Sequence, residues 1–335
     1  MEKTNFRAMN TNIEVCFQPA QPMEAADMQT LMTDVQLLFE QVEEIASRFR
    51  PDSELSKLNA AVAERSGGPR SRLESVSGPR FRLESATAEL GGDGEDTLTW
   101  MPISSMLCEM LKAAEDAFYE TEGIFNPGLL RHLQTAGYDD SFEKLPAKRD
   151  SRGEADAELP LPTVLPFQLD LRQKAIRVQP GTQLDLGGIA KGWTVDRAAR
   201  HLRQFGCGFV NAGGDLRAFG QPQEPWNIGV ADPFDPERNV AELQLSTGAV
   251  ATSSTVKRRW QQGSAWQHHL LDARTGRPSN TTIASATVTA PTAVQADVWA
   301  KTALLLGPKR GAEFLQRRKQ KGVFVEHSRH VQVVN

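Results

Sequence analysis

Cysteine is scarce in this sequence. The chain has three, Cys16, Cys108 and Cys207, among 335 residues. They lie far apart in apolar surroundings, so they have the spacing of neither a disulfide framework nor a zinc site. We expect three buried thiols.

An excess of positive charge is also lacking. The formal net charge is -4, and no run of Lys or Arg is long enough to line a polyanion groove. Proteins that bind nucleic acid usually present a basic face to its phosphates. Nucleic acid is therefore not expected as a partner.

Long apolar runs are absent as well. No apolar stretch reaches the length that spans a bilayer, although the chain is 39% hydrophobic and can build a proper core. The first residues, MEKTNFRAMNTNIEV, lack a charged start followed by an apolar stretch and a cleavage site. We expect no membrane segment and a cytoplasmic location.

Hydrophobic periodicity predicts a mixed α and β fold. Apolar residues recur at steps of three and four in some segments, as on one face of a helix, and other segments are short β-type runs between turn residues. The predicted helices are 26–47, 104–120, 189–204 and 294–306, and the predicted strands are 12–18, 226–231, 248–253, 268–272 and 284–290.

One stretch between the first two helices has a different composition. SGGPRSRLESV (66–76) is followed by the near-copy SGPRFRLESA (77–86), and a GGDGED run comes after them. Such Gly, Ser and Arg content buries little apolar surface. We interpret 60–98 as a flexible insert within a single domain of residues 1–335, and 147–160 as a second polar loop. The alternative for the insert is an arginine-rich docking arm for an acidic partner.

Two glycine motifs mark a candidate binding site, DLGGIAKG (185–192) and NAGGD (211–215). Glycine lets main-chain N–H groups approach a ligand closely, and a helix predicted to begin near 189–191 would add its positive end. The pattern predicts a phosphate cradle with Lys191 and Asp215 at its edges. It matches neither GxxxxGK[ST] nor GxGxxG, so a plain turn between strand and helix explains it equally well.

Eight blocks taken together are more specific. In order, they are FRPDSELSKLN (49–59), EGIFNP (122–127), DLGGIAKGWTVD (185–196), NAGGDLRAFG (211–220), GVADP (229–233), VATSS (250–254), HHLLDARTGRPS (268–279) and SATVTAPTAVQADVWAKTALLLG (285–307). With them the chain resembles the FAD:protein FMN transferases of the ApbE type. The resemblance implies an α+β enzyme, one large mixed α/β domain of two interlocked subdomains with an FAD pocket in the cleft between them.

The resemblance also implies the chemistry. Such an enzyme binds FAD, uses Mg²⁺, and moves the FMN half of FAD onto a Ser or Thr hydroxyl of a target flavoprotein, releasing AMP. His269 would accept the hydroxyl proton, and Asp297 would hold the metal together with a main-chain oxygen at Gly188. The residues that would contact FAD are Met9, Phe49, Ile124, Phe125, Asn126, Asp185, Lys191 and Asp215.

Ordinary structural roles remain open for several of these residues. His269 can be a structural histidine in a strand, and Asp297 can be a helix-start residue. Phe49 and Phe125 can belong to the core. Asp272 and Arg274 are expected to fix the turn before Gly276 rather than to contact substrate.

The chain departs from the family pattern at three positions. Asn10 replaces the Gly of M-G-T, Ala273 replaces a Pro, and Lys301 stands where many members have a metal-binding Thr. An ammonium cannot ligate a cation, so Lys301 either points away or neutralises the phosphates itself. A hydrolase that splits FAD into FMN and AMP, and a flavin-binding protein without turnover, are therefore alternative functions.

Overall fold

The structure is a computed structural model that describes residues 1–65, 99–145, 148–149, 159–263 and 265–335. Most of the predicted flexible insert, with its two near-copies, lies outside these residues. Residues 60–65 differ from the prediction, because they form the end of helix α2 (Glu54–Arg65). Leu58 and Val62 of this helix are buried, which explains why it continues toward the polar stretch.

Eight antiparallel strands form a central sheet. β16 lies inside this sheet and is buried along almost its whole length. In spatial order the strands are β1 (Glu2–Ala8), β2 (Thr11–Pro19), β7 (Gly206–Ala212), β8 (Asp215–Phe219), β11 (Gly248–Ser254), β16 (Ile283–Ala290), β17 (Gly322–Glu326) and β18 (Val331–Val334).

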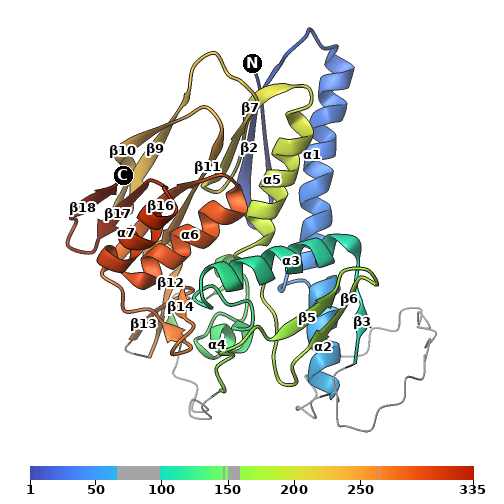
Figure 1. Cartoon of the computed structure of the whole chain (residues 1–335), viewed down its shortest axis with the longest axis vertical. Helices are drawn as coiled ribbons and strands as arrows, with labels where there is room; N and C mark the ends of the chain where they lie inside the picture. The colour runs from blue at the N-terminus through green and yellow to red at the C-terminus, as the bar shows by residue number, and fades with distance from the viewer. Residues whose placement is uncertain (66–98, 146–147, 150–158, 264) are drawn as a thin grey trace.

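Four helices cover one face of this sheet, as Figure 1 shows. α5 contacts β7 and β8, whereas α6 contacts β11 and β16. α6 is apolar on nearly all sides because it is enclosed by the sheet and by other helices. The four are α1 (Ala25–Ala46), α5 (Ala190–Leu202), α6 (Ala293–Leu306) and α7 (Pro308–Arg317).

A second group of elements lies at the lower end of Figure 1. It contains α2, α3 (Ser105–Glu120), α4 (Leu130–Thr135), the short helix η1 (Phe142–Lys144), and a sheet of β3 (Met101–Pro102), β6 (Ala175–Val178) and β5 (Phe167–Asp170). One hydrophobic core joins α2, α3, β5 and β6 of this group to the central sheet, whereas α4 and η1 contribute to a second, smaller cluster. The α+β prediction is therefore confirmed.

Three small sheets complete the fold. They are β9 (Trp226–Asp232) with β10 (Asp235–Leu245), β4 (Lys148–Arg149) with β12 (Arg259–Gln262) and β13 (Ala265–His268), and β14 (Leu271–Asp272) with β15 (Arg277–Pro278). The strand predicted over 268–272 is wrong in one respect, because the chain leaves β13 at His268 and re-enters a different sheet at Leu271. The gap contains His269.

Two further predictions concern the cysteines, expected to be buried thiols, and the absence of a membrane segment. All three cysteines, which lie within the described residues, are free thiols; Cys16 and Cys108 are buried and Cys207 is partly buried. Within the described part of the chain, no helix combines the length and apolar character needed to cross a bilayer.

α5 and the start of α6 meet backbone to backbone. A methyl group at Gly192 would lie 2.8 Å from the Val294 nitrogen and 2.9 Å from the Ala293 carbonyl carbon, which is closer than real contacts allow. Asp196, one turn later on α5, accepts hydrogen bonds from the N–H groups of Ala293 at 2.8 Å and Val294 at 3.1 Å. Thr292, the N-cap residue of α6, accepts from the Gln295 N–H at 3.2 Å, so α5 adds a second set of acceptors at the start of α6 as well as the surface on which α6 rests.

Gly192→Ala is expected to lower the free energy of unfolding by about 1–3 kcal/mol, because the added methyl group must push the two backbones apart. Urea denaturation of the variant and of the wild type measures this difference. Arg200→Ala, on the exposed side of the same helix, is the matched control and should change stability by less than about 0.5 kcal/mol. Equal stability of Gly192→Ala and wild type would contradict the close contact.

Candidate functional site

A cavity of about 510 Å³ lies where the central sheet meets the loops of the second group. Small-molecule sites in proteins typically occupy about 300–1,000 Å³. The residues lining the cavity include every site residue predicted from the sequence: Met9, Phe49, Ile124, Phe125, Asn126, Asp185, Gly188, Lys191, Asp215, His269 and Asp297. The structure therefore brings these residues together, while their individual roles stay predictions.

Two neighbouring hairpin turns form one edge of the cavity. Met9 and Asn10 connect β1 to β2 with φ of 51° and 55°, and Gly213 and Gly214 connect β7 to β8 with φ of 63° and 105°. Asn tolerates the left-handed region better than most residues, which explains how Asn10 replaces a glycine. A methyl group at Gly213 would collide with the Thr11 hydroxyl. The NAGGD glycines are therefore required by a tight, closely packed turn.

The DLGGIAKG segment is a compact turn into α5. The N–H groups of Ile189 and Ala190 both donate to the Leu186 carbonyl, at 2.9 and 2.8 Å, and the Gly187 N–H donates to the Asp185 carboxylate at 3.0 Å. These amides are already paired. The turn thus has fewer free donors than the predicted phosphate cradle needs, so charged side chains become the main candidates for binding phosphate.

Arg48 links two of the predicted FAD contacts. Its Nε atom lies 3.6 Å from Asp185 Oδ1, and its guanidinium carbon lies 4.1 Å from the centroid of the Phe49 ring. The same guanidinium lies 4.5 Å from the Tyr138 ring and donates to the Tyr138 carbonyl at 3.0 Å. Phe49 is therefore not a free aromatic face, because Arg48 covers part of it.

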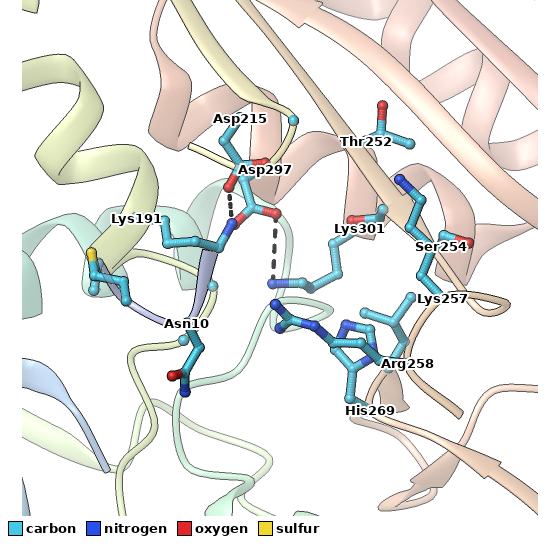
Figure 2. A pocket seen from close by; sticks show the side chains of 18 of the residues that line it. Asn10, Lys191, Asp215, Thr252, Ser254, Lys257, Arg258, His269, Asp297 and Lys301 are labelled. Atoms are coloured by element: carbon cyan, nitrogen blue, oxygen red, sulfur yellow. Dashed lines mark hydrogen bonds and ion pairs between the residues drawn. The ribbon is translucent and has the colours of Figure 1, made fainter. Parts of the chain in front are cut away.

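Two lysines and two aspartates form a charge cluster in the cavity, defined here as Lys191, Asp215, Asp297 and Lys301. Lys191, at the start of α5, forms an ion pair with Asp215, at the start of β8. Asp297 and Lys301 lie one turn apart on α6, with Lys301 Nζ 4.0 Å from Asp297 Oδ1. Figure 2 shows both pairs joined by dashed lines. Asp215 and Asp297 are only 3% and 7% exposed, so both carboxylates depend on these ammonium partners.

Burial and charge shift the protonation of the first pair. Burial, reinforced by the negative charge of Asp297, raises the pKa of Asp215 to about 6 against the lowering effect of Lys191. Burial disfavours the charged form of Lys191, but the attraction of Asp215 and Asp297 outweighs it and raises the pKa of the ammonium. The charged forms of Lys191 and Asp215 are thus stabilised by their attraction for each other rather than by solvation.

The Lys301 ammonium lies against the glycine turn. A methyl group at Gly188 would collide with Lys301 Nζ and would lie 3.0 Å from the Phe125 ring. Nζ itself is 5.6 Å from the centroid of that ring. Lys301 therefore points toward Gly188 and not away from the site, which answers the question that the sequence left open.

The two adjacent histidines have different surroundings. His268 is fully engaged, since its Nδ1 accepts from the Leu270 N–H at 3.3 Å and its Nε2 lies 3.0 Å from the Ser279 carbonyl oxygen. His269 is partly exposed in the cavity, and its buried Nδ1 has no hydrogen-bond partner among the described residues. His269 is therefore the histidine that can accept a proton from a ligand.

Burial, together with the positive charges of Arg258 and Lys301, holds the pKa of His269 well below its usual range. The imidazole is therefore neutral at pH 7, which is the form that a general base needs. An anionic ligand beside the same cations would oppose this shift and make the ring a stronger base.

Three other predicted residues hold turns or loops in place. The Asp272 carboxylate accepts from the Arg274 backbone N–H at 2.9 Å and pairs with its guanidinium, and neither residue lines the cavity. The Asn126 amide donates to the Pro162 carbonyl at 2.7 Å and accepts from the Gly128 N–H at 2.9 Å. The turn role expected for Asp272 and Arg274 is confirmed, and the Asn126 side chain also holds its own loop.

The sequence argument did not identify Lys257 and Arg258, which also line the cavity. They follow β11 in the run VKRR (256–259), and Figure 2 shows both on the side of the cavity that carries His269. A basic run directly after a strand that ends at the candidate site was the signal that could have indicated them.

The stability of the protein should depend on His269 between pH 7.5 and 5.5. Because its folded pKa lies below the unfolded value of about 6.5, the unfolded state binds more protons as pH falls, and stability decreases. His269→Gln is expected to make this decrease shallower, as measured by urea midpoints across the range. His330→Gln, at an exposed residue, is the control; a slope for His269→Gln equal to that of wild type would contradict the burial argument.

Comparison with known proteins places this site in context. Residues 9–325 match the model of the ApbE family. A protein of Klebsiella pneumoniae named FAD:protein FMN transferase is 34% identical over 157 residues, which are 46% of this chain and 48% of that protein. A protein of the same name from Vibrio cholerae is 27% identical over 307 residues, 90% of this chain and 79% of that protein. The first alignment thus spans about half of the relative's length.

Solved structures share the fold. The ApbE protein of Thermotoga maritima superposes with a TM-score of 0.76 at 23% identity, covering 100% of this chain and 97% of that one. The apo form of the flavinyl transferase ApbE of Pseudomonas stutzeri superposes with a TM-score of 0.76 at 20% identity, covering 100% and 94%. At these identities the likeness establishes the fold.

Proposed function

We propose that this chain, which belongs to the ApbE family, transfers the FMN part of FAD to a Ser or Thr hydroxyl of an acceptor protein and releases AMP. The observation that carries the proposal is the His269 imidazole, a neutral base that lines a cavity which also contains the ammonium groups of Lys191 and Lys301. The relatives named FAD:protein FMN transferase supply the substrate class.

The proposed reaction is a phosphoryl substitution. The acceptor oxygen attacks the phosphorus of the FMN phosphate, forming a new P–O bond, while the His269 imidazole takes the hydroxyl proton. The P–O bond to the bridging oxygen breaks, and AMP leaves with its electron pair. Because negative charge builds up on the phosphoryl oxygens, nearby cations accelerate the step. Lys301 and Arg258 are the candidates for this role, since both act on His269.

The remaining lining residues fit the two ends of FAD. Met9, Ile124 and Phe125 supply apolar surface, and Phe49 supplies the ring face that Arg48 leaves uncovered. Asp185 can accept a hydrogen bond from a ribose hydroxyl or a ring N–H, because Arg48 and the Gly187 N–H hold its carboxylate in place. These contacts are part of the proposal.

The Mg²⁺ ion that the resemblance implies does not fit this donor set. Mg²⁺ takes oxygen ligands at near-octahedral positions. Proteins usually hold it through one or two carboxylates together with water and substrate phosphates, so the site needs at least one carboxylate that is open to the ion. Asp297, the predicted ligand, faces the Lys301 ammonium instead of an open coordination position. The proposed reaction therefore contains no step through a metal.

The transferase proposal is tested with purified protein, FAD and a flavoprotein domain that carries a Ser or Thr acceptor. We expect AMP in chromatography and an acceptor heavier by one FMN in mass spectrometry, and no adduct on the acceptor with Ala at that position. AMP without adduct would identify the chain as an FAD hydrolase. Intact FAD without AMP would identify a flavin-binding protein without turnover.

His269→Gln is expected to lower kcat about 10²–10⁴-fold, because the hydroxyl then loses its proton without a base. FAD affinity, measured by quenching of flavin fluorescence, should change little. His268→Gln removes the neighbouring ring, which is committed to backbone partners, and is the matched control. A larger loss of kcat in His268→Gln than in His269→Gln would show that His269 is not the base.

A further inference from the structure

We propose that the Lys301 ammonium occupies the place of a divalent cation in this chain, so that FMN transfer here proceeds without bound metal. This inference rests on the proposed function, because it concerns the charge that stabilises the transferred phosphoryl group. Its direct consequence, the absence of a divalent-cation site, is testable without any turnover.

The position of the ammonium is the first argument. The two residues predicted to hold the metal are Gly188 and Asp297, and Lys301 Nζ lies between them. It is 4.0 Å from Asp297 Oδ1, and a methyl group at Gly188 would collide with it. The Lys301 side chain is 20% exposed and lines the cavity. A cation coordinated by Asp297 and the Gly188 carbonyl would have to displace this ammonium.

The charge balance is the second argument. The two buried carboxylates of the cluster, Asp215 and Asp297, are matched by the two ammonium groups of Lys191 and Lys301. A divalent-cation site needs uncompensated carboxylates, because dehydrating the ion is costly unless negative ligands replace its water. Here a bound ion would instead meet two positive neighbours at short range. Arg258, which lines the same cavity, adds a third.

The chemistry of lysine is the third argument. An ammonium carries one positive charge and three N–H donors, so it can bind phosphoryl oxygens that a metal would otherwise neutralise. It comes from α6, whose start is fixed on α5, and needs no free ion for its position. Turnover by this chain should therefore be insensitive to chelators.

The experiment measures metal binding directly. Mn²⁺, whose electron paramagnetic resonance signal is lost on binding, is titrated into wild type and Lys301→Thr, each with and without FAD. Wild type should show no binding at concentrations up to about 1 mM, the upper end of the range over which protein sites for hard cations fill. Lys301→Thr should gain at least tenfold in Mn²⁺ affinity, because removal of the Lys301 ammonium leaves the Asp297 carboxylate free to bind the ion.

Three variants make the result specific. Lys257→Thr removes the same charge and a similar volume from the same cavity, and should not gain Mn²⁺ binding. Lys301→Arg keeps the charge and should not gain it either. Asp297→Asn combined with Lys301→Thr should lose the gained affinity, since a neutral amide is a poorer ligand for a hard cation.

Stoichiometric Mn²⁺ binding to wild type would overturn the proposal, even if Lys301→Thr does not fold. AMP release that stops in EDTA and returns with Mg²⁺ in wild type would overturn it as well. If no variant releases AMP under any condition, the proposed function fails. The Mn²⁺ titration then still decides whether an ammonium has replaced the cation.

Discussion

The packing of α6 on α5 is the constraint on which the site depends. Gly192 lets the two backbones meet, and Asp196 binds the first N–H groups of α6. Lys191 directly precedes Gly192, and Asp297 lies in the first turns of α6. The contact between α5 and α6 therefore sets the distance between the Lys191 ammonium and the Asp297 carboxylate, which are more than a hundred residues apart in the sequence. The position of these two charged groups is thus decided by backbone contact.

The same contact between α5 and α6 determines the electrostatics of the cavity. Two buried carboxylates face two ammonium groups, and the amides of Gly187, Ile189 and Ala190 are already paired. Under the proposed function, binding of phosphate would therefore rely on cationic side chains more than on main-chain donors. A neutral cluster also means that an incoming diphosphate brings the dominant charge into the cavity, where the low dielectric makes its interactions strong.

Much of the fold could be predicted from the sequence, because α1 has apolar residues at helical spacing, α6 is apolar on nearly all sides, and β16 is a short run of Ala, Val, Ile, Ser and Thr followed by a turn. The residues of the site were found through short blocks that come together only in three dimensions. The glycines were harder to interpret, since the sequence cannot show that the N–H groups after Leu186 are paired within the turn. The direction of Lys301 was out of reach for the same reason, because it depends on the distance between α6 and a turn far away in the chain.

The collision between a methyl group at Gly188 and the Lys301 ammonium has an evolutionary consequence. The two positions occupy one shared volume, so neither can change freely while the other stays. In relatives with a short side chain at the position of Lys301, this volume is open to other occupants, and an alanine at the position of Gly188 would meet only the ring at the position of Phe125. Aligned sequences of the family should therefore show covariation of these two columns, with lysine in one accompanied by glycine in the other.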